Sequence, residues 1–309
     1  MDITFLGTGS GVPSKLRNVS SLVLEMHQER DEVWLFDCGE ATQHQILNTP
    51  IKPRKINKIF ITHIHGDHIF GLPGLLSSRS FQEGTSTLEI YGPKGVKEFI
   101  ETALSVSQTH LRYTIKYFEV TDGVLFEDEQ IKVTAMSLVH GVPSYGFLIE
   151  EADQIGPLLP SKLKEKGVQP GPIFQEIKNN EVITLDDGTK IIRGEVTGPD
   201  ILGRKVAILG DTLPFDDVIE FVRDADVLVH EATFTHEDAK LAQQYNHSTS
   251  EQAAKIAKEA NVKQLLLNHI SSRYQQEQLQ QELEHLKEII KHVTYVKDFD
   301  SYEVLKEGR

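Results

Sequence analysis

Apolar residues occur along this chain in short runs that are separated by glycine, proline and polar residues. Runs of this length, rich in branched and aromatic side chains, are typical of β-strands. Early runs follow one another closely, whereas later ones alternate with helical patterns. We expect strands at residues 2–8, 21–26, 33–39, 58–63, 88–93, 113–120, 130–138, 145–150, 205–211, 226–232, 264–269 and 293–299.

Three segments have the apolar spacing of amphipathic helices, at residues 93–108, 248–260 and 276–292. The second of these begins with Ser and Thr followed by Glu251, which is the pattern of a capping box. Strands that cluster early and alternate with helices later predict two sheets with helices outside them, a layered α/β arrangement.

Residues 151–200 differ from the rest because they are rich in glycine, proline and charge and have no long apolar period. We interpret them as an insertion that projects from one domain spanning residues 1–309. A plain surface excursion is the alternative interpretation.

Composition narrows the classes of protein that the chain can represent. With 309 residues and 39% hydrophobic residues it can bury a sizeable core, and no apolar run is long enough to span a membrane. The N-terminus has no basic region of a signal peptide, and Cys38 is the single cysteine, so we expect a cytoplasmic protein. The net charge of −14 disfavours nucleic-acid binding unless cations gather locally.

The segment KIFITHIHGDHIFGLPG, residues 58–74, joins an apolar run to four potential metal ligands: His63, His65, Asp67 and His68. In an extended chain the first three share one face, and a turn at Gly66 would direct the fourth elsewhere. Ligands in two directions suit two neighbouring cations. Imidazole with carboxylate suits zinc, and also manganese or cobalt.

Two zinc ions need further ligands, and four candidates stand at the ends of other expected strands: His140, Asp211, His230 and His269. Chemistry in open α/β layers gathers at the carboxyl ends of strands. Asp211 is the expected bridge, because a carboxylate can contact two metals through its two oxygens. We expect structural roles for the remaining histidines outside loop 246–250, which are His27, His44, His110, His236, His285 and His292.

The segment THIHGDHIFGLPG resembles the H-x-H-x-D-H signature of the metallo-β-lactamase superfamily, which implies a four-layer αββα sandwich with a two-metal hydrolytic site. FLGTGSGVPSKLRN, LFDCGEATQHQ, FGLPGLLSSR, HGVPSYGF, VHEATF, NHSTSEQAA and NHISSRY resemble one branch, the ribonuclease Z family. That family consists of endonucleases that mature the 3′ end of tRNA. The resemblance extends from about residue 4 to residue 274.

The resemblance implies two zinc ions per subunit, for which Mn²⁺ or Co²⁺ could substitute. It assigns His63, His65 and His140 to one zinc, Asp67, His68 and His269 to the other, and Asp211 to both. His230 then ceases to be a ligand and supports the site from outside. Two positions depart from the family pattern, Asn268 where Thr is usual and Ala41 where Gly is common, and neither is a ligand.

The resemblance also implies the roles of residues around the metals. Asp67 would orient or deprotonate the attacking water, and His247 would protonate the leaving 3′-oxygen with Glu231 as its orienting carboxylate. Precursor tRNA would be held by the insertion, which resembles the family's substrate-binding arm, and the enzyme would be a homodimer. The expected substrate-binding residues are Lys15, Arg17, Lys162, Lys164, Lys166 and Arg273.

Two other functions are compatible with part of these patterns. A thioester or lactone hydrolase of the same superfamily would share the metal signature but needs neither the insertion nor the PSKLRN segment. A metal-stabilised RNA-binding subunit with a decayed site is disfavoured, because every expected ligand and the proton-donor candidate are present.

Overall fold

The computed structural model describes residues 1–306, which form sixteen strands, eleven α-helices and two 3₁₀ turns. The strands are β1 (Asp2–Gly7), β2 (Ser21–Met26), β3 (Glu32–Phe36), β4 (Ile56–Phe60), β5 (Leu88–Gly92), β6 (Ile115–Glu119), β7 (Gly123–Glu127), β8 (Ile131–Leu138), β9 (Ser144–Glu151), β10 (Val182–Thr184), β11 (Lys190–Ile192), β12 (Lys205–Leu209), β13 (Val227–Glu231), β14 (Gln264–Asn268), β15 (Val293–Tyr295) and β16 (Ser301–Glu303). The helices are α1 (Thr42–Ile46), α2 (Gly66–Ile69), α3 (Leu72–Phe81), α4 (Val96–Val106), α5 (Pro160–Glu165), α6 (Ile173–Asn179), α7 (Arg193–Val196), α8 (Asp217–Phe221), α9 (Ala239–Gln244), α10 (Ser250–Glu259) and α11 (Gln276–Ile289), and the turns are η1 (Pro53–Lys55) and η2 (His236–Asp238).

The chain divides into two compact units, of which the larger comprises residues 1–150 and 205–304. Its strands form two seven-stranded mixed sheets, in the orders β16-β1-β2-β3-β4-β5-β6 and β15-β14-β13-β12-β9-β8-β7. Strands β3 to β6 run parallel, as do β12 to β15, while β1, β2 and β9 pair antiparallel with their neighbours.

Alternation along the strands produces separate hydrophobic layers on the two faces of each sheet. In β3, Trp34 and Phe36 join a core that also contains Phe147 of β9, so this core lies between the sheets. Val33 and Leu35 face the other way and pack with residues of α1, α3 and α4. Because neighbouring residues of a strand point to opposite faces, one short apolar run supplies two layers.

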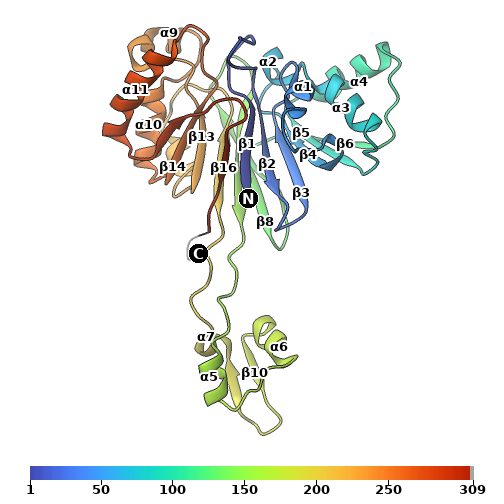
Figure 1. Ribbon diagram of the computed structural model, residues 1–309, viewed down its shortest axis with the longest axis vertical. Helices are drawn as coiled ribbons and strands as arrows, with labels where there is room; N and C mark the ends of the chain where they lie inside the picture. The colour runs from blue at the N-terminus through green and yellow to red at the C-terminus, as the bar shows by residue number, and fades with distance from the viewer. Residues whose placement is uncertain (307–309) are drawn as a thin grey trace. The chain divides into compact units, whose positions relative to one another are not determined.

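Helices α8, α10 and α11 cover the outer face of the second sheet through a third apolar cluster. Figure 1 shows α3 and α4 on one side of the strands and α10 and α11 on the other. Aromatic rings strengthen the core between the sheets, where Phe60 stacks on Phe36 and Tyr91 at centroid distances of 4.9 Å. Such pairs contribute about 0.5–1.5 kcal/mol beyond their burial. The expected αββα sandwich is therefore confirmed.

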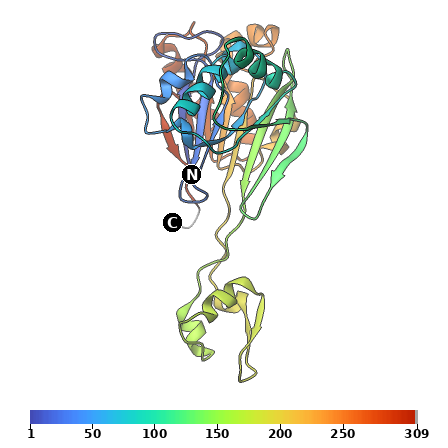
Figure 2. The ribbon, with the colours of Figure 1, turned by 90° about the vertical axis from the view of Figure 1, so that its right-hand side faces the viewer.

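Among the described residues, the smaller unit contains residues 151–204, whose helices and hairpin are visible in Figure 2, and residues 305 and 306. It has a hydrophobic core of its own. Its helices α5, α6 and α7 pack with the antiparallel β10–β11 hairpin around the buried side chains Leu163, Val168, Ile177, Ile191 and Val196. At its base Arg204 donates to the Glu151 carboxylate at 2.8 Å. The segment 151–200, which the sequence predicts to be an insertion, therefore lies within a unit that has its own folded core.

The cap of α10 differs in one residue from the expected pattern. Thr249 accepts a hydrogen bond from the Gln252 main-chain N–H, and the Gln252 side chain accepts one from the main-chain N–H of Thr249. Gln252, not Glu251, is therefore the second member of the capping box, because it occupies the third helical position. Among residues 1–306 no helix is long and apolar enough to cross a membrane.

Candidate metal centre

Seven of the expected metal ligands converge where strands of both sheets reach their carboxyl ends. His63 follows β4, and the short helix α2 carries Asp67 and His68. His140 follows β8, Asp211 follows β12, and His269 follows β14. Their donor atoms form overlapping groups of three within 4.8 Å, namely His63–His65–His140, His63–His68–Asp211 and Asp67–His68–His269.

Gly66 permits the change of direction within the H-x-H-x-D-H segment. The chain leaves β4 and stays irregular through His65, and helix α2 begins at Gly66. A Cβ atom at this position would lie 2.3 Å from the Phe70 ring, so a larger residue would force the two apart. The helical turn places Asp67 and His68 beside the centre, whereas the sequence interpretation assumed an extended chain as far as Asp67.

Four histidines each have one ring nitrogen bound to a partner outside the centre. His63 Nδ1 lies 3.0 Å from the Thr62 hydroxyl, and His68 Nδ1 lies 2.7 Å from Asp37 Oδ2. His140 Nδ1 donates to the main-chain oxygen of Asn246 at 2.7 Å, and His269 Nδ1 lies 2.8 Å from the Thr233 hydroxyl. Such contacts orient each ring and select the nitrogen that remains available.

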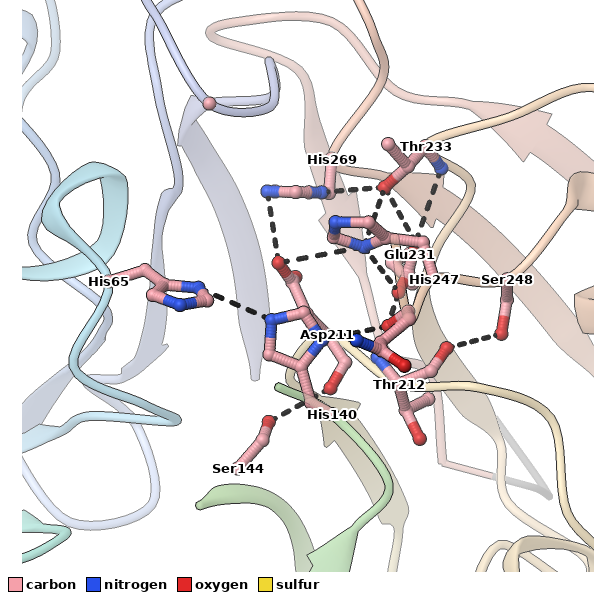
Figure 3. A network of polar contacts seen from close by, with 12 residues as sticks. His65, His140, Ser144, Asp211, Thr212, Glu231, Thr233, His247, Ser248 and His269 are labelled. Carbon is pink, nitrogen blue, oxygen red and sulfur yellow. Dashed lines mark hydrogen bonds and ion pairs between the residues drawn. The ribbon is translucent and has the colours of Figure 1, made fainter. Parts of the chain in front are cut away.

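The available nitrogens and two carboxylates face one another. His68 Nε2 lies 3.3 Å from His269 Nε2, and His140 Nε2 lies 3.2 Å from His65 Nδ1, a pair that Figure 3 shows directly. Asp211 Oδ2 is 3.4 Å from His269 Nε2, 3.6 Å from His68 Nε2 and 3.7 Å from His63 Nε2. Asp211 Oδ2 thus lies close to at least one member of each of the three donor groups.

Burial and neighbouring charges shift the pKa values of these side chains in different directions. Burial lowers the pKa of His63 well below its usual value, and burial together with His140 lowers that of His65. Burial raises the pKa of Asp211, but His269 and His68 outweigh it, so the carboxylate stays ionised. For His68, burial is outweighed by Asp37 and Asp211, which raise its pKa, so a cation would displace a proton there.

The donor set fits a pair of divalent cations. His63 Nε2 is buried and has no hydrogen-bond partner among residues 1–306, although a buried polar atom without one costs about 1–3 kcal/mol. Imidazole nitrogens face each other at hydrogen-bond distance, and four of the five rings have an orienting partner behind them. This arrangement leaves lone pairs directed at shared points. Nitrogen and carboxylate donors of this kind suit zinc or manganese.

His247 lies beside this centre with a carboxylate behind it. Its Nδ1 is 2.9 Å from Glu231 Oε1, and Glu231 also accepts from the Thr212 main-chain N–H and the Thr233 hydroxyl (Figure 3). Burial lowers the pKa of His247, but the Glu231 carboxylate outweighs it and raises the pKa to about 9. The imidazole is therefore protonated at neutral pH and can act as an acid.

His230 lies outside the centre. It is fully buried, and its Nδ1 contacts the main-chain oxygen of Glu231 at 2.8 Å. Neighbouring residues of a strand point to opposite faces. Since the Glu231 side chain points to the centre, that of His230 points away from it.

The expected substrate-binding residues differ in whether their charged groups already contact other groups of the protein. Lys15 and Lys162 are exposed, as is Lys164, whereas Lys166 pairs with Glu195 at 2.6 Å. Arg17 uses its guanidinium inside the larger unit, donating to the Thr8 hydroxyl at 2.7 Å and to the Val296 main-chain oxygen. Arg273 lies over the Phe234 ring, with its guanidinium carbon 5.2 Å from the centroid.

Sequence reasoning missed four residues that support the centre. Asp37 and Thr62 orient His68 and His63, Thr233 orients His269, and the main-chain N–H of Gly11 donates to Asp67 Oδ2 at 2.8 Å. Asp37 and Thr62 lie near the carboxyl ends of the expected strands 33–39 and 58–63, and Thr233 directly follows the expected strand 226–232, which was a usable signal. Gly11 had none, because it lies in a loop that only the tertiary structure brings to the centre.

Comparison with known proteins agrees with this fold. Residues 1–156 match the family model described as Anti-Pycsar protein Apyc1, and residues 183–270 match that of the beta-lactamase superfamily domain. The crystal structure of the short form of human tRNase Z is similar over 99% of this chain and 100% of its own, with 33% identity and a TM-score of 0.72.

Curated relatives extend the similarity over the whole chain. Ribonuclease Z of Anoxybacillus flavithermus is 56% identical over 308 residues, which are 100% of this chain and 99% of the relative. Ribonuclease Z of Bacillus subtilis is 57% identical over 275 residues, 89% of this chain and 90% of the relative. An identity this high along the full length goes beyond a shared fold, and the chain therefore belongs to the ribonuclease Z family of the metallo-β-lactamase superfamily.

Proposed function

We propose that this protein is a zinc-dependent endoribonuclease that hydrolyses the phosphodiester at the 3′ side of tRNA precursors. It would remove the 3′ trailer and leave a 3′-hydroxyl on the tRNA. The observation that carries the proposal is the convergence of a seven-ligand centre with the His247–Glu231 pair, in a chain 56% identical to a ribonuclease Z.

His63, His65 and His140 would hold one zinc, Asp67, His68 and His269 the other, and Asp211 would contact both. Bound divalent cations would supply an activated water and neutralise charge on the phosphoryl group. The orphaned Nε2 of His63 and the outer partners of the other rings support this assignment. Mn²⁺ or Co²⁺ could fill the same sites.

The chain's own residues would move the protons. Asp67, held by the Gly11 main-chain N–H at 2.8 Å, would orient the attacking water or accept its proton. His247 would donate a proton to the leaving 3′-oxygen, since Glu231 holds its Nδ1 and leaves Nε2 free to donate. A donor whose pKa is raised to about 9 is charged at neutral pH and ready for this step.

Precursor tRNA would be the substrate, and the smaller unit would bind its body. Two lysines on α5, Lys162 and Lys164, are exposed and can contact phosphates without reading sequence. The net charge of −14 disfavours nucleic-acid binding, but this value does not include bound metal ions. Two divalent ions would add positive charge at the site and offset part of the repulsion.

We further propose that the enzyme works as a homodimer in the cytoplasm. Exposed apolar side chains on the helices over the first sheet support self-association: Leu47, Phe70, Phe81 and Val106 are 62–81% exposed. Sedimentation of the purified protein tests the oligomer, and a monomer at micromolar concentration would count against it.

The decisive experiment is cleavage of an end-labelled tRNA precursor by the metal-replete protein, with and without chelator, with mapping of the product ends. We expect a tRNA with a 3′-hydroxyl and complete loss of cleavage in chelator. An intact precursor beside rapid thioester hydrolysis would instead favour the small-molecule hydrolase.

Deletion of residues 155–190 separates binding from chemistry. Cleavage of the precursor should fall strongly, whereas hydrolysis of a small chromogenic phosphodiester should fall far less, since the deleted residues lie outside the metal centre. An equal loss of both activities would show that the segment is needed for folding.

A further inference from the structure

A cleft of about 740 Å³ in the larger unit has no role in the mechanism described above. Its walls come from the loop before β2, from α11 and from the segment after β15. Apolar and aromatic side chains that include Leu16, Tyr274, Leu283 and Phe299 line it, and Lys15 and Lys297 stand among them. A cleft of this size and mixed lining is typical of a binding site for a small organic group.

Phe299 lies in this wall with a strained backbone conformation. Its φ angle is 71°, in the left-handed region that bulky side chains rarely adopt, and its side chain is 43% exposed. The main chain is fixed there by a hydrogen bond from Phe299 N–H to the Phe5 oxygen at 2.7 Å. A ring that is nearly half exposed in a strained position gains less from burial than a core ring does, so the fold alone does not account for Phe here.

Two lysines of the cleft have no partner within residues 1–306, whereas its Arg17 and its acids are engaged. Lys15 and Lys297 are exposed, and within residues 1–306 their ammonium groups make no hydrogen bond or ion pair. Asp298 accepts from the Thr8 hydroxyl and from the main-chain N–H of Asn18. Asp300 accepts from the main-chain N–H of Lys297 at 2.9 Å. The cleft thus presents free positive charge next to aromatic surface, in a chain of net charge −14.

One loop connects this cleft to the metal centre. Gly11 donates its N–H to Asp67 in the centre, and the cleft wall begins at Ser14. Three residues of extended chain span at most about 10 Å. A strand of nucleic acid with its scissile phosphate at the centre could therefore place a neighbouring nucleotide in the cleft.

We propose that this cleft receives one unpaired nucleotide of the RNA close to the scissile bond, with its base stacked on Phe299 and a phosphate near Lys297. Aromatic side chains beside uncommitted cations are the usual means of holding single-stranded nucleic acid without strict sequence choice. This inference rests on the proposed function, because it takes the scissile phosphate to lie at the metal centre.

The test replaces the bases of the unpaired nucleotides around the cleavage site, one at a time, by abasic residues. With the wild-type protein, an abasic residue at one of these positions should lower kcat/KM by about 5- to 150-fold, the usual effect of losing one stacked base. Phe299→Asn should show the same loss with intact precursor and no further loss with that abasic precursor. The kcat/KM for a small chromogenic phosphodiester normalises each variant for the state of the metal centre.

Asn is chosen because it tolerates a positive φ, so the melting temperature of Phe299→Asn should equal or exceed that of the wild type. Phe118→Asn is the matched control, since Phe118 is 40% exposed and lies outside the cleft. For the cation, Lys297→Gln should weaken RNA binding and reduce its salt dependence, while Lys291→Gln, which is also exposed but lies outside the cleft, should not.

The inference is overturned if, at every abasic position, the loss of kcat/KM for Phe299→Asn with the abasic precursor equals the product of the two separate losses. It is also overturned if Phe299→Asn lowers kcat/KM no more than Phe118→Asn does. It is also overturned if free mononucleotides protect the cleft from chemical modification but RNA does not, which would indicate an effector site. If the wild type leaves the precursor uncut, the proposed function itself has failed.

Discussion

The contact between Asp37 and His68 offers a quantitative test of how the centre is held. Asp37 receives three donors, the Thr62 main-chain N–H at 2.8 Å, the Thr62 hydroxyl at 2.9 Å and His68 Nδ1 at 2.7 Å. Asn at this position keeps the shape but offers a single acceptor oxygen. At least one of the three donors would then face the amide nitrogen and lose its bond.

The expected effect follows from these contacts. Loss of a buried hydrogen bond to a charged group costs about 1.5–3 kcal/mol of stability. Partners that orient metal-binding histidines typically change metal affinity by about 10- to 100-fold. Asp37→Asn should therefore weaken the proposed metal site that includes His68 by this factor. The proposed site that includes His63 should lose less affinity, because Asp37 reaches His63 only through Thr62.

Competition with a chromogenic chelator measures both affinities in one titration. Glu282→Gln is the matched control, because Glu282 is also a buried carboxylate that contacts a histidine, His236, at a distance from the centre. It should lose stability but bind zinc normally. The reasoning is refuted if Asp37→Asn binds two zinc ions as tightly as the wild type, or if both variants lose zinc equally.

Three further predictions concern the proton donor and the second metal. His247→Ala should lower kcat for precursor cleavage by about 10²- to 10⁴-fold at unchanged zinc content; zinc loss in elemental analysis would mark it as structural or a ligand. Glu231 raises the pKa of His247 to about 9, so activity should fall as pH rises through that value. In Glu231→Gln this alkaline limb should move down by about one to two pH units, and an unmoved limb would remove Glu231 from the donor pair. Asp67→Ala should abolish cleavage and leave about one zinc per chain, and full activity would contradict its assignment.

Local pattern alone determined much of the architecture. Strand β2 was expected at residues 21–26 and spans Ser21–Met26, because a short apolar run bounded by polar residues fits a strand that is buried on both faces. Helix α3 was missed, since Pro73 and Gly74 obscure its helical pattern. Strand β16 was missed as well, because three residues become a strand only by pairing with β1 at the other end of the chain.

At the metal centre, too, the local sequence determined some features and the tertiary structure determined others. His63, His65, Asp67 and His68 stand within six positions, so the sequence alone identified them as a metal-binding group. The tertiary structure decided which atoms meet: it brought His269 within 3.3 Å of His68 across 201 residues and committed Arg17, an expected substrate contact, to Thr8 and Val296. Spacing along a chain determines which side chains share a face, whereas the partner that satisfies a buried polar atom depends on loops that only packing brings together.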